Sequence, residues 1–124
     1  MLSVVVIDDD MAMRTLICEW LMAEGYRVRG LAAVDGRGSS SGNADVDLVI
    51  VNVLNLRSHG AQTLREAQAA YPRSALIGMS TQLGRSLPGD SALARSLGVR
   101  RLVAKPLARD EMLAGVIATI GLPV

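Results

Sequence analysis

One α/β domain is predicted, a doubly wound sandwich in which helices cover both faces of a five-stranded parallel sheet. Five short apolar runs recur along the 124 residues, and amphipathic helical patterns lie between most of them. Strands that alternate with helices usually form a parallel sheet through right-handed crossovers. Half of the residues are hydrophobic, which is enough for one sizeable core.

The predicted strands are residues 2–7, 26–31, 48–53, 75–79 and 102–104. Four of these runs are nearly continuously apolar, as expected for strands that are covered on both faces. The run "YRVRGL" at 26–31 alternates polar and apolar residues instead. This alternation indicates a half-exposed strand, which we place at an edge of the sheet.

Helical spacing of apolar residues predicts helices over residues 11–24, 60–71, 91–97 and 108–120. The apolar stripe of the first helix consists of Met13, Leu16, Ile17, Trp20 and Leu21. We assign Trp20 and the methionines Met11, Met13 and Met22 to this helix and to core packing. Residues 35–47 hold three glycines and three serines, so we expect the second helix of the alternation to be very short or replaced by a loop.

Composition excludes several classes of protein. Thirteen basic and twelve acidic residues give a net charge of +1, which offers no electrostatic case for binding nucleic acid. One cysteine, Cys18, and one histidine, His59, cannot form a disulfide framework or a Cys/His zinc site, and we place His59 in a surface loop. There is no signal-peptide pattern and no run of about 18 apolar residues. We expect a soluble, cytoplasmic protein that contacts no membrane.

Polar residues follow the predicted strands where each strand ends. Asp8 and Asp9 end the first strand, Asn52 ends the third, Ser80 ends the fourth, and Lys105 follows the fifth. Ligands of open α/β sheets bind at these carboxyl ends. Adjacent carboxylates suit Mg²⁺, although capping of the first helix is an alternative role that we prefer for Asp10.

The ordered set "VVVIDDD", "ALIGMST" and "VAKP", with Gly60 eight residues after Asn52, resembles the bacterial response-regulator receiver (CheY-like) domain over essentially the whole chain. The resemblance implies a flavodoxin-like sheet in the order 2-1-3-4-5. It also implies a non-enzymatic role in two-component phosphorelay signalling. The chain then corresponds to a single receiver-like domain over residues 1–124, of the kind found within longer regulators.

The resemblance assigns roles to the strand-end residues. Asp8 and Asp9 would hold Mg²⁺, and Ser80 and Lys105 would contact phosphoryl oxygens, with a cis bond from Lys105 to Pro106. Taken singly, Ser80 is an ordinary strand-end hydroxyl and Lys105 a solvated lysine. Asn52 stands where the family carries its phospho-accepting aspartate.

Asn52 departs from the family's pattern at the residue that would accept the phosphoryl group. Its carboxamide is neutral and a very poor nucleophile, so no acyl phosphate and no catalytic residue are expected. Loss of a carboxylate weakens any Mg²⁺ site formed by Asp8, Asp9 and Asn52, and no cofactor is required. Lys105 is then free to bridge directly to Asp8 or Asp9.

Other departures concern the read-out of phosphorylation. Leu102 occupies the position where receivers commonly have a rotating Tyr or Phe. The loop after Ser80 is longer than in the family and would place Arg85 over the site. Together these features predict a pseudo-receiver that acts through protein–protein contacts.

The expected partner is a kinase, an output domain or a second copy. The family's helix 4–strand 5–helix 5 face is the candidate homodimer surface, and its arginines are Arg95, Arg100, Arg101 and Arg109. A merely solvated face is the alternative interpretation of these charges. Two other functions stay open: a phospho-switch that uses Asp8 or Asp9 as acceptor, and a small flavodoxin-like nucleotide or cofactor binder. Three aspartates after the first strand argue against the latter because they would repel a phosphate.

Overall fold

The protein is described by a computed structural model that covers residues 2–33, 45–53, 60–83, 86–105 and 108–123. It contains one sheet in the order β2-β1-β3-β4-β6-β5. The first five of these strands pair in parallel, as predicted. In chain order the strands are β1 (Ser3–Ile7), β2 (Arg27–Leu31), β3 (Leu48–Asn52), β4 (Ala75–Ser80), β5 (Leu87–Pro88) and β6 (Arg101–Ala104).

The sixth strand was not predicted. β5 pairs antiparallel with the outer edge of β6 and lies in the long segment that follows β4. Two residues are too few to show any alternation of polar and apolar side chains, so the pattern of the sequence could not reveal this strand. Pro88 lacks a backbone N–H, which is tolerated at an edge position.

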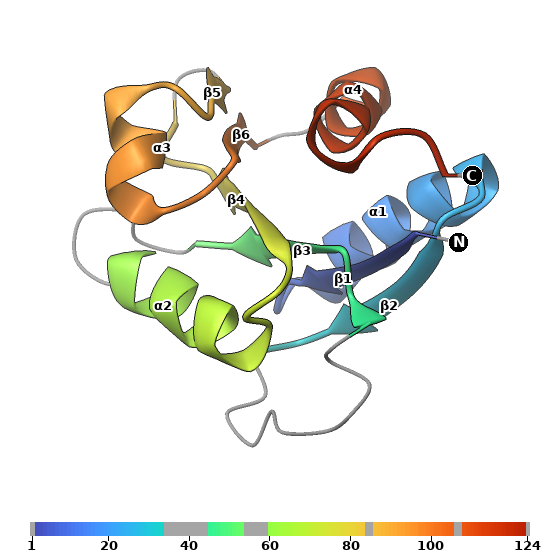
Figure 1. Ribbon diagram of the computed structural model, residues 1–124. Coiled ribbons are helices and arrows are strands. Elements are labelled where there is room, and N and C mark those ends of the chain that lie inside the picture. The colour runs from blue at the N-terminus through green and yellow to red at the C-terminus, as the bar shows by residue number, and fades with distance from the viewer. Residues whose placement is uncertain (1, 34–44, 54–59, 84–85, 106–107, 124) are drawn as a thin grey trace.

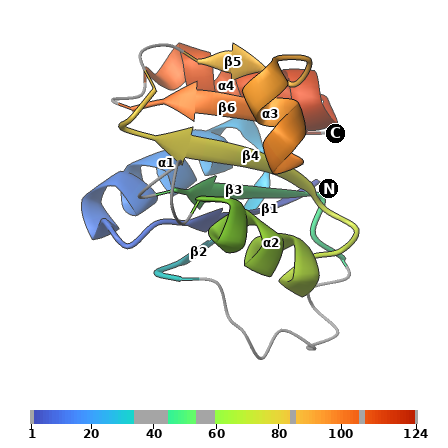
Figure 2. The ribbon, with the colours of Figure 1, turned by 90° about the vertical axis from the view of Figure 1, so that its left-hand side faces the viewer.

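Helices cover both faces of the sheet (Figures 1 and 2). α1 (Met11–Glu24) and α4 (Arg109–Ile120) cover one face, and α2 (Gly60–Ala70) and α3 (Ala92–Leu97) cover the other. Asp10 caps α1 by accepting a hydrogen bond from the Met13 backbone N–H at 3.1 Å, in its expected role. The second helix was expected to be short or absent in residues 35–47, of which 35–44 lie outside the described residues. His59 lies outside them as well.

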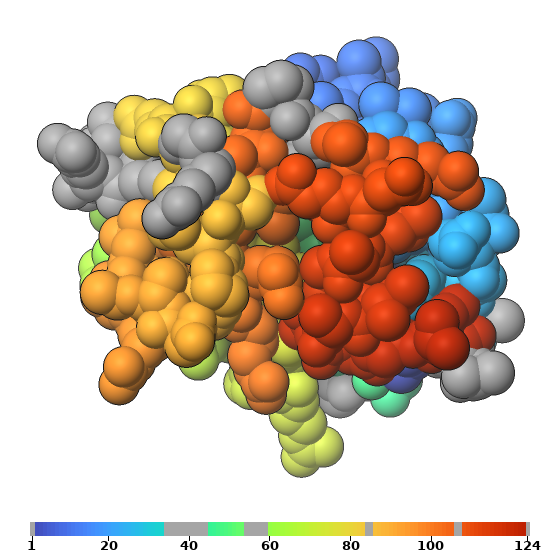
Figure 3. All heavy atoms as spheres, turned by 90° about the horizontal axis from the view of Figure 1, so that it is seen from above, coloured from blue at the N-terminus to red at the C-terminus, as the bar shows by residue number. Residues whose placement is uncertain are grey.

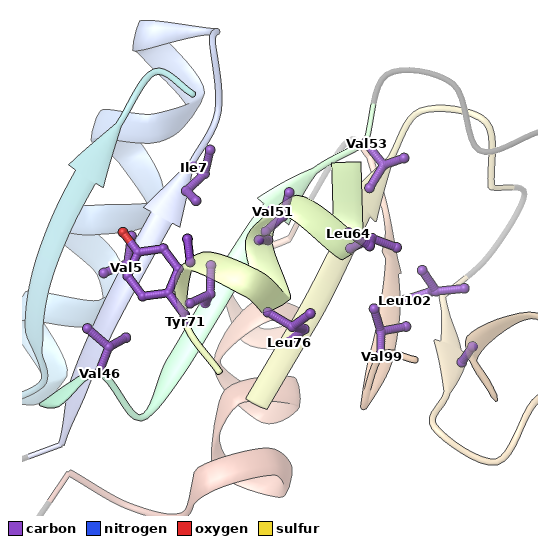
Figure 4. Close-up of a cluster of buried hydrophobic side chains, with 14 residues drawn as sticks. Val5, Ile7, Val46, Val51, Val53, Leu64, Tyr71, Leu76, Val99 and Leu102 are labelled. Carbon is purple, nitrogen blue, oxygen red and sulfur yellow. The ribbon is translucent and has the colours of Figure 1, made fainter. Parts of the chain in front are cut away.

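Two apolar clusters fill the space on either side of the sheet. Val4 and Val6 point to the α1/α4 side, whereas Val5 and Ile7 point to the α2/α3 side, and all four are buried. Figure 4 shows the cluster on the α2/α3 side, with Tyr71 and Leu102 among its members. Burial of both faces explains why the inner strands are continuously apolar. β2 is an edge strand with exposed Arg27 and Arg29, as predicted.

The assignment of the α1 methionines to the core is wrong for two of them. Met11 and Met22 are 68% and 51% exposed, and Leu16 of the predicted stripe is 40% exposed. Ile17 and Leu21 are the buried residues of the helix. Met22 follows Leu21 by one position, which turns its side chain about 100° away from the buried face. Among the described residues, no helix is long and apolar enough to cross a membrane.

Gly78 of β4 makes room for Leu102 of the neighbouring strand. The two residues are register partners, and a Cβ added at Gly78 would lie 2.9 Å from Leu102 Cδ2. We expect Gly78→Ala to lower the free energy of unfolding by about 1–3 kcal/mol, because the added methyl group overpacks a buried position. Urea unfolding checks this value. In a Leu102→Val background, which removes Cδ2, the cost should fall to less than half; an equal cost in both backgrounds would contradict the packing argument.

Tyr26 ties the end of α4 to the start of β2. Its hydroxyl donates a 2.7 Å hydrogen bond to the Gly121 carbonyl, and burial, with a smaller contribution from Glu24, raises the pKa of Tyr26. Tyr26→Phe should cost about 0.5–1.5 kcal/mol at neutral pH. A raised folded-state pKa stabilises the fold below the ordinary tyrosine pKa of about 10 and loses that effect as pH rises further. Urea unfolding at several pH values should therefore show that the stability difference between wild type and Tyr26→Phe shrinks above about pH 10. A difference that grows with pH would refute the role assigned to the neutral Tyr26 hydroxyl.

Candidate functional site

Three of the strand-end residues meet through Lys105. Its Nζ lies 2.9 Å from Asp8 Oδ2 and 3.0 Å from Asn52 Oδ1. β1 and β3 are neighbours in the sheet, and only β4 separates β3 from β6. Two strand spacings amount to about 10 Å, which the side chains of Lys105 and Asn52 cover together by extending towards each other from the ends of β6 and β3. The direct bridge from Lys105 to Asp8, suggested by the sequence, is present in the structure.

The ion pair is almost completely shielded from water. The side chain of Lys105 is 10% exposed and that of Asp8 is 0% exposed. A buried pair of this kind is stable only when further hydrogen bonds satisfy its remaining atoms. Asp8 meets this requirement, because its Oδ1 accepts a 3.0 Å hydrogen bond from the Asp10 backbone N–H. The carboxylate therefore has a partner on each oxygen.

Arg14 also holds Asp8 in place, a role that the sequence analysis did not identify. Arg14 Nη1 donates a 2.8 Å hydrogen bond to the Asp8 carbonyl, and the Asp8 N–H donates to the Leu31 carbonyl at 3.0 Å. Arg14 lies in the first turns of α1, on the flank that faces β2, where its side chain approaches Gly30. Only the fold shows that this flank passes over the end of β1.

Ser80 is fully buried at the end of β4. Its hydroxyl accepts a 3.0 Å hydrogen bond from the Gln82 backbone N–H, and its carbonyl accepts a 2.9 Å bond from the Lys105 N–H. The second bond places the backbones of Ser80 and Lys105 side by side. The role of Ser80 as a phosphoryl contact stays a prediction.

Two of the predicted Mg²⁺ ligands contact Lys105 in this structure, and the Mg²⁺ site stays a prediction. A divalent cation needs several oxygen ligands, but Asp8 Oδ2 and Asn52 Oδ1 both bind the Lys105 ammonium. Asp9, the third predicted ligand, is exposed. Within the described residues, no group of three or more His, Cys, Asp or Glu side chains could hold a metal ion. The ammonium supplies the local positive charge in this arrangement.

Leu102 is fully buried and forms part of the cluster beneath α2 and α3 (Figure 4). It fills the space left open by Gly78. A leucine in this position has no polar tip that could seek a partner outside the core. The side chain at the predicted switch position is thus an ordinary core residue.

The segment that follows β4 is tied to its neighbours by Ser86. The Ser86 hydroxyl donates to Glu111 Oε1 in the first turn of α4 and accepts from the Ala104 N–H at 2.9 Å. These bonds connect the segment to β6 and to α4. Sequence reasoning missed Ser86 because it lies in a stretch without a periodic pattern. Arg85, which we expected over the site, lies outside the described residues.

The four arginines of the predicted interface differ in their surroundings. Arg95 and Arg100 are exposed. Arg101 is half-buried and its Cδ approaches Gly115, while its buried Nε has no hydrogen-bond partner among the described residues. Arg109 pairs with Glu24 of α1 at 3.5 Å, and their side chains are 52% and 40% exposed. Arg95 and Arg100 are therefore the arginines whose charges are most available to a partner.

Comparison with known proteins supports a receiver domain. The chain is 31% identical over 111 residues to the regulatory protein VirG of Rhizobium radiobacter, covering 90% of this chain and 40% of that protein. It is 30% identical over 119 residues to the transcriptional regulatory protein CpxR of Klebsiella pneumoniae, covering 95% and 49%. The chain thus spans less than half the length of these curated relatives. No family model matches it.

Solved structures show the same fold. The non-phosphorylated HemR receiver domain of Leptospira biflexa superimposes with a TM-score of 0.75 at 19% identity, covering 98% of this chain and 96% of that one. A receiver domain protein (CheY-like) from Methanospirillum hungatei gives a TM-score of 0.72 at 17% identity, covering 97% and 94%. The chain has the flavodoxin-like receiver fold. Its relatives and its structural neighbours together support a response-regulator receiver domain of the CheY-like class.

Proposed function

We propose that this chain is a pseudo-receiver of two-component signalling, which acts through protein–protein contacts and is not phosphorylated at its strand-3 position. The observation that carries the proposal is Asn52, whose amide oxygen is bound to Lys105 at the carboxyl ends of the strands. Phosphoryl transfer to a side chain needs an anionic oxygen there, and a carboxamide does not provide one. The site keeps the lysine and loses the nucleophile.

The buried ion pair supports the same interpretation. Lys105 contacts Asp8 and Asn52 at once, so the ammonium supplies the positive charge that a metal would bring to these oxygens. The domain then needs no cofactor, and its affinity for Mg²⁺ is weak. The inward position of Leu102 agrees with a fixed rather than a switching output face.

A phospho-switch that uses another acceptor is the alternative. Asp8 is a poor candidate, since it is 1% exposed and each of its carboxylate oxygens already has a partner. Asp9 is exposed and is the acceptor that this alternative requires. The third function, a nucleotide or cofactor binder, is disfavoured by the acidic residues that follow β1, because they repel phosphate.

The proposed contact surface is the face formed by α3, the β5–β6 edge of the sheet and α4, shown in Figure 3 with α3 in orange and α4 in red. Arg95 of α3 and Arg100, which directly precedes β6, are exposed. The proposed partner is a kinase, an output domain or a second copy of the chain. In this proposal the domain is not an enzyme, works in the cytoplasm and binds neither nucleic acid nor membrane. The full-length regulators VirG and CpxR, of which the chain spans less than half, motivate an output partner.

Treatment with acetyl phosphate and Mg²⁺ tests the proposal. Freshly purified chain, with Asn52 verified by peptide mapping, is followed by intact mass. We expect no stable adduct, whereas a gain of about 80 Da, the mass of one phosphoryl group, would overturn the proposal. If an adduct forms, loss of that gain in Asp9→Asn but not in Asp10→Asn would establish the alternative acceptor.

A further inference from the structure

We propose that the site hydrolyses the side-chain amide of Asn52 and converts this residue to aspartate. The inference concerns a covalent modification of the chain by its own residues. It rests on the contacts of Asn52 and its neighbours and not on the signalling role proposed above. If the hydrolysis does not occur, the amide form simply persists and the proposed function is unaffected.

Lys105 is placed to catalyse this reaction. Its ammonium donates to Asn52 Oδ1 at 3.0 Å, and Oδ1 is the atom on which negative charge develops when a nucleophile adds to the amide carbon. A fixed donor at such an atom lowers the barrier, and it acts more strongly where water is excluded. The ammonium is 10% exposed, and Asp8 contacts it from a second side at 2.9 Å. The donor is therefore in position before the reaction begins.

The proposed reaction requires a water molecule at the amide carbon of Asn52. Asn52 is partly exposed, whereas Val51 before it and Val53 after it are buried. The oxygen of a water molecule bonds to Cγ, and Lys105 stabilises the resulting oxyanion. The Cγ–Nδ2 bond then breaks, the nitrogen takes up one proton of the water, and ammonia leaves. The carboxylic acid that remains gives its proton to the ammonia, which becomes ammonium. The sum is one amide and one water giving one carboxylate and one ammonium ion, without any oxidant or reductant.

The usual intramolecular route of asparagine deamidation is blocked here. That route requires the backbone nitrogen of the next residue to attack Cγ and form a cyclic imide. The Val53 N–H instead donates a 2.8 Å hydrogen bond to the Met79 carbonyl, and Val53 is β-branched. Breaking this strand pairing would leave a buried backbone group without a partner. Direct hydrolysis gives aspartate only, while the imide route also gives isoaspartate.

The product would matter for function. An aspartate in place of Asn52 supplies the carboxylate that the pseudo-receiver lacks, next to Lys105. The same chain would then exist in two forms, an amide form without an acceptor and a hydrolysed form with one. The conversion is slow, irreversible and set by the site itself.

The test follows the purified chain of residues 1–124 at mildly alkaline pH by intact mass and peptide mapping. We expect a gain of about 1 Da located at Asn52, as aspartate without isoaspartate, about 100-fold faster in the folded chain than in urea. Asn43 and Asn55 are controls in the same chain for ordinary deamidation. The proposal is overturned if Asn52 remains an amide, if folding does not accelerate the change, or if isoaspartate forms. A loss of about 17 Da, from attack by Lys105 itself, would overturn it as well.

A double variant tests the role of Lys105. Asp8→Asn/Lys105→Met removes both charges of the buried pair, so that neither is left unpaired, and should slow the conversion of Asn52 about 100-fold. Tyr26→Phe loses one hydrogen bond away from the site and should react at the wild-type rate. A double variant that reacts as fast as the wild type would refute catalysis by Lys105. If the double variant does not fold, the comparison of folded with urea-unfolded wild type still decides the proposal.

Discussion

Lys105→Met is expected to lower the free energy of unfolding by about 3–5 kcal/mol. The substitution leaves the Asp8 carboxylate without its cationic partner, and that carboxylate is 0% exposed. The destabilisation comes from an uncompensated buried charge more than from the lost attraction, because burying an unpaired ion costs far more than a typical hydrogen bond contributes. Urea unfolding followed by circular dichroism measures it.

The matched control is Asp8→Asn/Lys105→Met. Removing both partners leaves no buried charge, and replacement of whole buried ion pairs is often nearly neutral. The double variant should therefore be more stable than the Lys105→Met variant. Equal destabilisation of the two variants, or no effect of Lys105→Met, would show that the contact is not a buried ion pair in solution.

Asn52→Asp is expected to tighten Mg²⁺ binding about 10- to 100-fold. At an effective dielectric constant of about 20, a full negative charge about 4 Å from a cation contributes up to about 4 kcal/mol per unit charge of the cation. The net gain is smaller, because the Lys105 ammonium competes with Mg²⁺ for the same carboxylate. Charged oxygen ligands are also those that Mg²⁺ prefers. Calorimetric titration of wild type and variant gives the ratio of dissociation constants.

Asp10→Asn serves as the control for this titration. Asp10 caps α1 and lies outside the contacts of Lys105, so the loss of its charge should change Mg²⁺ affinity far less. Equal affinities of wild type and Asn52→Asp would mean that the amide is not what limits metal binding.

Much of the fold could be predicted from the sequence, because the way most helices and strands are buried leaves a recognisable pattern of apolar residues. The continuous apolar runs of β1 and β3 reflect burial on both faces, and the exposed arginines of β2 reflect an edge. β5 could not be predicted, because two residues carry no periodicity and its partner is fixed by tertiary pairing. Met11 and Met22 were misplaced because hydrophobicity alone does not say which side of a helix faces the sheet.

The site was predictable where the sheet topology alone brings residues together. Asp8, Asn52 and Lys105 lie at the carboxyl ends of strands that share one edge of the sheet, and the structure joins them through one ammonium. Arg14 and Ser86 were missed because their hydrogen bonds depend on the direction of a side chain from a helix and from an irregular segment. Such directions follow from packing, which no spacing in the sequence encodes.

We propose that Asn52 silences an otherwise retained receiver site. An NMR titration with Mg²⁺ and then beryllofluoride, on wild type with intact Asn52 and on Asn52→Asp, tests it most directly. We predict that only Asn52→Asp shows chemical-shift changes across the residues that follow β1, β3, β4 and β6. Site-wide changes in the wild type would contradict the account.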